Sequence, residues 1–305
     1  MERITKSLYR PFVVEYCYFD RVWNAMVSQL PKYVAPGHDA PPMIVVSGVG
    51  STTGFSCIMT KMLPNLDVVS KSQVLPLFWY EEPQLNGGLL DNLEQGLSRR
   101  EGISRWSLDQ FSSAFGRKIS REEIFYYCYG VLHSEDFRAA YEDNLVKERP
   151  RIPLATSAGD FDAFVAAGRE LADLHLNYEN VEPYPLEEVC TRPELAPSEL
   201  YRVVKMTFPK GQAVKDRPSS IVYNAFVSLH GIPDEAWDYM LSGKAALYWI
   251  VDRFRLTPDK ESGIVNDPNE YSDDPRYIID LVKRVVTVSV RTLEIVRSLP
   301  TLDFD

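Results

Sequence analysis

One stretch of the chain decides the fold, and it runs from Ser120 to Glu179 as SREEIFYYCYGVLHSEDFRAAYEDNLVKERPRIPLATSAGDFDAFVAAGRELADLHLNYE. Ser120 is followed three residues later by Glu123, and this capping-box spacing predicts that a helix begins here. Apolar residues then recur at helical spacing in three segments, which short polar or proline-containing joints separate. The stretch therefore predicts three helices whose apolar sides face one another and form a rigid centre.

The two later helices of this centre carry their own signals. Ser134 precedes the acidic residues Glu135 and Asp136, which suit the positive end of a helix. Pro150 and Pro153 end this helix, because proline has no N–H to donate and restricts the residue before it. In the third helix the residues expected on one side are Phe161, Phe164, Val165, Gly168, Leu171, His175 and Tyr178.

Blocks inside and beyond this stretch resemble a known protein family. Those within the helical centre are YGVLH at 129–133, RPRIPL at 149–154, GRELA at 168–172 and LHLNYE at 174–179. Those that follow, in the family's order, are YN at 223–224, GIP at 231–233, AALYWI at 245–250 and SGIVNDPN at 262–269. Together they are similar to the C-terminal specificity region of single-chain type I-like restriction–modification enzymes, also called type ISP enzymes.

In that family one long polypeptide joins a nuclease, a helicase-type ATPase, an adenine methyltransferase and a target-recognition domain, and this chain resembles only the last part. The resemblance implies sequence-specific recognition of double-stranded DNA, which would position the target adenine for the methyltransferase. It also implies that the methyltransferase and helicase domains are partners in the same polypeptide. We expect no cofactor in this chain, since AdoMet, ATP and Mg²⁺ belong to the other domains.

The catalytic sequence motifs of such an enzyme do not occur in the chain. No Walker A sequence, G-x-x-x-x-G-K-[ST], is present to cradle phosphates. The pattern of an adenine methyltransferase, a polar residue followed by Pro-Pro and an aromatic residue, is also missing. We therefore expect this chain by itself to bind without catalysis, as an excised domain would.

The rest of the chain favours a mixed α/β (α+β) fold, in which sheet segments flank the central helical bundle. The expected parts are a strand-rich segment at 1–100, the helical core at 101–185 and an α/β segment at 186–305. The predicted strands are 43–47, 66–69, 74–80, 201–208 and 220–229, with a turn at 83–88. The further predicted helices are 107–114, 232–242, 245–254 and 277–299.

Charge is unevenly distributed along the chain. The net charge of −10 argues mildly against a free-standing nucleic-acid binder, although binding depends on the local field. Residues 99–121 nevertheless hold six basic against two acidic residues, and residues 201–217 hold five against one. We predict that the helical centre gathers both segments into one groove that contacts DNA phosphates and base edges. The candidate DNA-binding residues are Arg99, Arg100, Arg105, Arg117, Lys118, Arg202, Lys205, Lys210, Lys215 and Arg217.

The cysteines and the hydropathy pattern indicate a cytoplasmic protein. Cys17, Cys57, Cys128 and Cys190 are scattered without a C-x-x-C pair, so the sequence signals neither a zinc site nor a redox pair. Free thiols of this kind are typical of a reducing compartment. The sequence has no signal peptide and no apolar run of about 18 residues, the length a membrane helix needs.

A glycine-rich loop offers an alternative interpretation of the chain. Gly48, Gly50 and Gly54 follow a buried strand and precede Asp67, an arrangement similar to a nucleotide-binding fingerprint. The spacing is one residue too long, so we interpret the loop as a hairpin or bulge. The alternative is a Rossmann-type enzyme that binds AdoMet or a dinucleotide here. A second alternative is a scaffold that holds sister domains together.

Histidines in the helical centre could form a metal site. His175 and Glu179 lie four residues apart on one predicted helix face, and His133 ends a neighbouring helix. No further ligand is evident in the sequence. We interpret both histidines as helix caps or hydrogen-bonded core residues, and predict no metal site.

Overall fold

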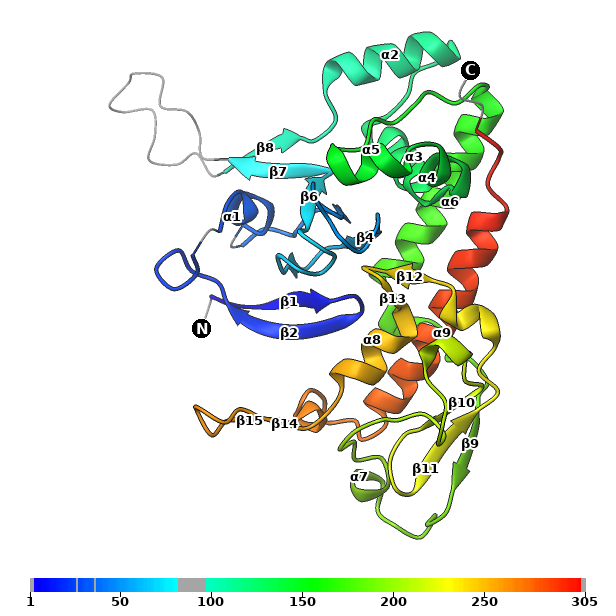
Figure 1. Cartoon of the computed structure of the whole chain (residues 1–305). Helices are drawn as coiled ribbons and strands as arrows, with labels where there is room; N and C mark the ends of the chain where they lie inside the picture. Colours follow the sequence, from blue (N-terminus) through cyan, green and yellow to red (C-terminus); the bar gives the residue numbers. More distant parts are fainter. Residues whose placement is uncertain (1–2, 26, 36, 82–96, 303–305) are drawn as a thin grey trace. The chain divides into compact units, whose positions relative to one another are not determined.

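The computed structural model describes residues 3–25, 27–35, 37–81 and 97–302. It holds nine α-helices and several small sheets within those ranges, so the expected mixed α/β fold class is confirmed (Figure 1). The predicted turn at 83–88 lies outside the described residues.

The chain divides into two compact units, which we describe separately. Unit 1 comprises residues 1–9, 14–172 and 299–305, and unit 2 comprises residues 10–13 and 173–298. The boundary near residue 172 falls inside one continuous helix, α6 (Ala158–Leu176). The three segments expected at 1–100, 101–185 and 186–305 remain a prediction.

Unit 1 contains three small sheets. The first has the order β2-β1-β5, and the second is antiparallel with the order β4-β3-β6. A two-stranded hairpin, β7-β8, forms the third. The strands are β1 (Ile4–Arg10), β2 (Val13–Tyr18), β3 (Met43–Val46), β4 (Cys57–Thr60), β5 (Leu63–Pro64), β6 (Gln73–Pro76), β7 (Phe78–Glu81) and β8 (Ser98–Glu101).

The glycine-rich loop connects two antiparallel strands. Gly48, Gly50 and Gly54 lie between β3 and β4, so a strand stands where a nucleotide-binding fold would place a helix. Gly50 and Gly54 adopt φ values of +74° and +76°, a region that favours glycine. The hairpin interpretation is confirmed, and this loop does not form the Rossmann arrangement.

The strand predicted at 66–69 is wrong. Those residues form a turn after β5, in which the Asn65 side chain accepts a hydrogen bond of 3.0 Å from the Asp67 N–H. Such side-chain bonding to a nearby backbone group competes with strand pairing. The strand predicted at 74–80 is present as β6 and β7, with a break between them.

The helices of unit 1 follow the sequence signals closely. Ser120 and Glu123 form both hydrogen bonds of a capping box at the start of α3. The second predicted helix is interrupted at Tyr141, whose φ of −115° is not helical, so two short helices replace one. The helices are α1 (Leu30–Tyr33), α2 (Arg105–Phe115), α3 (Arg121–His133), α4 (Glu135–Ala140), α5 (Glu142–Lys147) and the first part of α6.

Helices α3 and α6 approach each other closely at two glycines. A Cβ atom on Gly168 would lie 1.9 Å from the carbonyl oxygen of Tyr126, and one on Gly130 would lie 2.5 Å from that of Phe164. Only glycine permits such contact between helix backbones. An aromatic cluster lies beside this contact, where the Tyr127 ring is 5.0 Å from Phe161 and 5.9 Å from Phe164 between centroids. The predicted packing of the first helix against the third is therefore present.

Unit 2 is built around α9 (Tyr277–Arg297) and α8 (Ala246–Arg253), whose apolar sides are buried. Its three-stranded antiparallel sheet has the order β10-β11-β9. The remaining elements are α7 (Pro197–Leu200), β9 (Glu187–Cys190), β10 (Ser220–Val222), β11 (Val227–His230), β12 (Met240–Leu241), β13 (Lys244–Ala245), β14 (Thr257–Pro258) and β15 (Val265–Asn266).

Three predictions in unit 2 are wrong. The single strand predicted at 220–229 is a hairpin, in which β10 and β11 pair antiparallel. Residues 201–208 form only isolated bridges, from Lys205 to Arg255 and from Thr207 to Val222, because side chains and not a ladder hold this segment. The helix predicted at 232–242 is a short 3₁₀ turn at Asp234–Trp237, followed by the β12–β13 hairpin. Positive φ values at Ser242 (52°) and Gly243 (76°) form the hairpin turn, so this glycine reverses the chain.

Candidate nucleic-acid interface

The first two candidate arginines lie on β8 and are held by neighbours within unit 1. The Arg99 guanidinium lies 3.8 Å from the centre of the Phe78 ring, and its Nε is 3.3 Å from Glu101. The Arg100 Nε is 3.4 Å from a carboxylate oxygen of Glu81. Both guanidinium groups remain about half exposed, so they can still reach a phosphate.

Arg117 is a structural residue in this unit. It donates a hydrogen bond of 2.8 Å to Glu123 and a second bond to Asp162, which ties the start of α3 to α6. Burial opposes ionisation of Glu123, but hydrogen bonds from Arg117 and Ser120 outweigh it and lower the pKa of Glu123 to about 2. The Arg117 charge is therefore largely balanced inside the protein.

Three further cations of the first basic segment have no ion pair within the described ranges. Arg105 and Lys118 are exposed at the start of α2 and just beyond its end. Arg121, which we did not include among the candidates, is partly exposed and donates from Nε to the carbonyl oxygen of Ile103 at 3.2 Å. Because no carboxylate balances them, these residues are the stronger phosphate-binding candidates of unit 1.

The second basic segment, in unit 2, also contains some cations that pair with a carboxylate and others that do not. Arg202 pairs with Asp267 at 2.5 Å, and Arg217 pairs with Asp238. In contrast, all the lysines of the segment are exposed and form no ion pair with any residue that the structure describes. These lysines are Lys205, Lys210 and Lys215.

Side-chain amides fix the beginning of this segment. The Asn224 amide donates to the carbonyl oxygens of Leu200 at 2.7 Å and Arg202 at 3.0 Å. The Asn269 side chain accepts a hydrogen bond from the Val203 N–H and donates one to the Val203 carbonyl oxygen, both at 2.8 Å. The sequence blocks around Asn224 and Asn269 thus hold the basic segment, a role that their spacing alone did not reveal.

The two basic segments belong to different units, so their shared groove remains a prediction. Within unit 2, however, the structure brings together two cations that are distant in sequence. Lys205 and Arg255 are partners in an antiparallel bridge, and both are exposed. Arg255 was missed from the sequence because no local pattern indicates this pairing.

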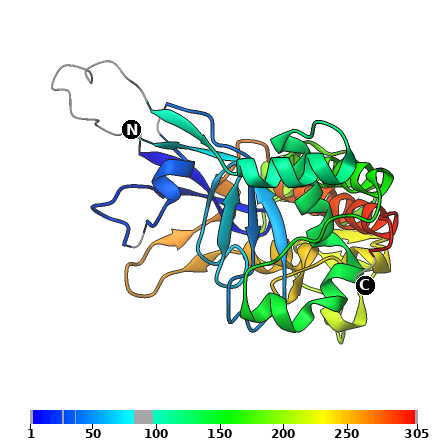
Figure 2. The same ribbon diagram turned by 90° about the horizontal axis from the view of Figure 1, so that it is seen from above.

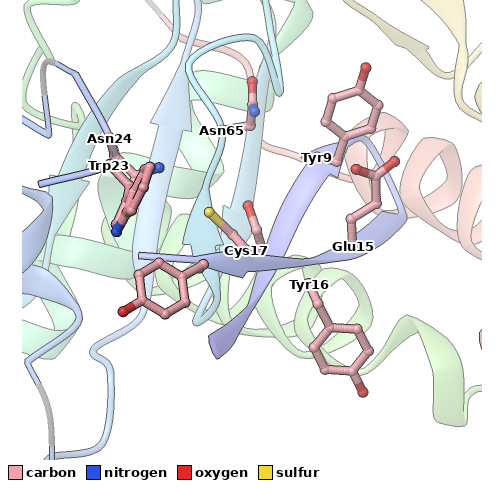
Figure 3. A pocket seen from close by; sticks show the side chains of 9 residues that line it. Tyr9, Glu15, Tyr16, Cys17, Trp23, Asn24 and Asn65 are labelled. Atoms are coloured by element: carbon pink, nitrogen blue, oxygen red, sulfur yellow. The ribbon is translucent and has the colours of Figure 1, made fainter. Parts of the chain in front are cut away.

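A pocket of about 670 Å³ lies over β1 and β2 in unit 1 (Figure 3). Tyr9 and Glu15 lie on one side of it, and Trp23 and Asn24 lie on the other. Trp23 is 77% exposed and neighbouring Tyr16 is 71% exposed. The residues that line this pocket include no lysine or arginine, so it offers aromatic surface but no cation for a phosphate.

The two histidines weighed as metal ligands are hydrogen-bonded core residues. His133 in unit 1 lies 2.9 Å from the Tyr129 carbonyl oxygen through Nδ1. His175 in unit 2 lies 2.9 Å from the Thr292 hydroxyl through Nε2 and stacks on Tyr239, and burial lowers its pKa to about 3. Throughout the described ranges, no three His, Cys, Asp or Glu residues are grouped as metal ligands.

None of the helices in the described ranges has the length and apolar character needed to cross a bilayer.

Comparison with known proteins places this arrangement in a class. Solved structures that match the chain include a nuclease-deletion mutant of the type ISP restriction-modification enzyme LlaGI with a DNA substrate mimic, at 34% identity and a TM-score of 0.81. DNA-bound LlaBIII, an ATP-dependent type ISP enzyme, matches at 33% identity with a TM-score of 0.85, and a DrdV–DNA complex matches at 33% and 0.83. The chain thus has the fold of a domain found in restriction–modification enzymes.

The family follows from the sequence as well. The model of the type ISP C-terminal specificity domain matches residues 1–281, and the chain belongs to this family. No curated protein matches it. The matches cover 100%, 100% and 99% of this chain but 25%, 19% and 29% of the LlaGI, LlaBIII and DrdV chains, so the chain spans less than a third of each. The expected resemblance is confirmed.

Proposed function

We propose that this chain recognises a specific site on duplex DNA as the target-recognition part of a restriction–modification polypeptide. The observation that carries the proposal is the match along the whole chain to three solved proteins that were determined with DNA or a DNA mimic. At the glycine-rich loop β3 and β4 are antiparallel, which speaks against the Rossmann-type alternative.

The cations that form no ion pair in the described part of the chain are the groups best suited to phosphate contacts. They comprise Arg105, Lys118 and Arg121 in unit 1, and Lys205, Lys210 and Lys215 in unit 2. A phosphate that approaches one of these residues does not have to compete with a protein carboxylate. Arg99, Arg100, Arg117, Arg202 and Arg217 have such carboxylates, and we assign them mainly to fixing the local structure.

In the proposed role this chain is one domain of a larger, multidomain polypeptide. In a type ISP polypeptide it would place the target adenine before a methyltransferase domain, and AdoMet, ATP and Mg²⁺ would bind to the methyltransferase, helicase and nuclease domains. Such an enzyme would act on DNA in the cytoplasm.

One surface of unit 1 favours a second role, contact with another domain of the polypeptide. The pocket over β1 and β2 presents Trp23 and Tyr16 to solvent, residue types that dominate the energy of protein interfaces. Because no cation lines it, this surface suits a protein partner better than a phosphate backbone.

A salt titration of duplex binding by the full-length protein tests the main proposal. A recognition domain that neutralises several phosphates should lose affinity steeply, with a slope of about −0.9 per phosphate contact in a plot of log K against log salt. A flat dependence, or no binding to any duplex at low salt, would reject DNA recognition and leave the scaffold role.

A further inference from the structure

A two-stranded ribbon projects from unit 2. Strands β14 and β15 pair with Thr257 opposite Asn266 and Pro258 opposite Val265. Both views of the fold show this ribbon extending away from helices α8 and α9 (Figures 1 and 2). All residues from Thr257 to Asn266 are exposed, so neither face of the ribbon packs on the rest of the unit.

The register places four polar side chains on one face. Directly paired residues of antiparallel strands share a face, which joins Thr257 to Asn266 and Lys205 to Arg255. Side chains two residues apart along a strand also share a face, which joins Arg255 to Thr257. The hydrogen bond from the Leu256 N–H to the Val204 carbonyl oxygen, at 2.9 Å, continues the pairing between these two pairs.

The opposite face has a different character. By the same alternation it carries Leu256, Pro258 and Val265, which have no polar side-chain atoms. The donors of the ribbon are therefore gathered on one side, and the apolar face provides a matched control for any substitution on the polar face.

Hydrogen bonds close the tip of the ribbon. The Asp259 side chain accepts hydrogen bonds from the Glu261 and Ser262 N–H groups at 3.1 and 2.8 Å, and from the Ser262 hydroxyl at 2.8 Å. Backbone bonds from Asp259 to Ile264 and from Gly263 to Asp259 close the turn. A ribbon fixed in this way presents its polar face with little loss of entropy on binding.

The Thr257 hydroxyl donates to the Arg255 carbonyl oxygen at 3.3 Å, whereas the other three donors of the polar face are available. Arg255 is 3.8 Å from Asp252, a long contact, and that carboxylate is already bound by Lys244 at 3.0 Å. The Asn266 side-chain oxygen accepts from the Tyr271 hydroxyl at 3.2 Å, which orients its NH₂ group as a donor. Lys205 has no ion pair within the described part of the chain. Arginine, lysine and asparagine are the side chains that most often read base edges.

We propose that the polar face formed by Lys205, Arg255, Thr257 and Asn266 enters the major groove of duplex DNA, where Arg255 and Asn266 read base edges and Lys205 contacts the adjacent phosphate. This inference rests on the proposed function, since it assigns the residues of that site. The major groove admits a two-stranded ribbon, and its guanine and adenine edges match the donor geometry of an arginine and an asparagine. Glu261, at the tip, is compatible with this placement because a carboxylate can accept from the cytosine amino group.

The test selects DNA with the full-length protein from a pool of duplexes with a random central sequence. Wild-type protein should enrich a defined site. Arg255→Ala and Asn266→Ala should each lose the preference at one or two positions of that site, with discrimination falling about five- to 150-fold. Arg255→Lys should lose it as well, because lysine keeps the charge but not the two-pronged geometry.

Val265→Ala, on the apolar face, is the matched control and should enrich the wild-type site. If the wild type enriches no sequence, the proposed function fails. If it enriches a site and the Arg255 and Asn266 variants enrich the same site, only the ribbon assignment is overturned. Equal loss of affinity for every duplex, with the site unchanged, would also overturn base reading, because it indicates phosphate contact alone.

Discussion

Gly168 of α6 lies against the carbonyl oxygen of Tyr126 in α3, so close that a Cβ atom there would be 1.9 Å from that oxygen. The contact lets two helices of unit 1 pack backbone to backbone. A real Cβ atom could be accommodated only if the helices moved apart, and this movement would weaken the aromatic packing between Tyr127 and Phe161.

The first prediction follows from this contact. Gly168→Ala should destabilise unit 1 by about 1–3 kcal/mol, the usual cost of overpacking a close contact, even though alanine is the better helix former. Urea unfolding monitored by circular dichroism measures the change.

Gly159→Ala, near the start of the same helix, is the control. A Cβ atom there would meet only the Ser157 hydroxyl at 3.6 Å, an ordinary contact, so stability should be unchanged or slightly higher. A Gly168→Ala protein as stable as wild type would show that α3 and α6 do not pack as described.

The second prediction concerns the lysines of the second basic segment. Replacing Lys205, Lys210 and Lys215 by alanine together should weaken duplex binding at every sequence. The salt slope should become shallower by about 0.9 for each phosphate that the variant protein no longer neutralises. Fluorescence anisotropy at several salt concentrations measures both quantities.

The matched control for this variant replaces three exposed lysines of unit 1 by alanine, namely Lys6, Lys61 and Lys147. It changes the net charge by the same amount but leaves the second basic segment intact. An equal effect from the control would indicate that net charge, rather than a specific surface, governs the binding of DNA.

A third prediction separates paired from unpaired cations. Arg217→Ala should weaken binding less than Lys205→Ala, because the Arg217 guanidinium is already balanced by Asp238. Removing that carboxylate with Asp238→Asn should free the arginine and strengthen binding modestly. If Arg217→Ala instead costs more than Lys205→Ala, the ion pair opens on DNA binding and the assignment is reversed.

The fourth prediction is a pH dependence in unit 2. Burial lowers the pKa of His175 to about 3, well below the value of about 6.5 expected when the chain is unfolded. The unfolded state therefore takes up a proton first, and stability that is complete above pH 6.5 should fall as the pH drops towards 3. Unfolding midpoints measured between about pH 4 and 7.5 follow this decrease.

His175→Gln should reduce that pH dependence, although it also lowers stability at neutral pH because the hydrogen bond with Thr292 is altered. His38→Gln is the control for the removal of an imidazole elsewhere in the chain, since His38 is exposed. A His175→Gln profile as steep as that of wild type would mean that other groups produce the pH dependence.

Local signals in the sequence predicted the helices well. The capping box at Ser120 and the apolar periodicity of 277–299 are signals carried by nearby residues of the chain. Both helices form where these signals predict them. The strand predictions were weaker. Residues 201–208 have strand-like composition, yet pairing partners decide whether a strand forms, and side-chain amides hold this segment instead.

The sequence by itself determined the fold class, the capped helices and the membership of the specificity-domain family, because each depends on short-range patterns or on blocks in fixed order. Tertiary structure alone decided which cations are balanced by carboxylates, since the partners of Arg117 and Arg217 include residues distant in sequence. It also decided that Lys205 and Arg255 share one face. The two residues are distant in sequence, and no local sequence pattern predicts which strand segments pair.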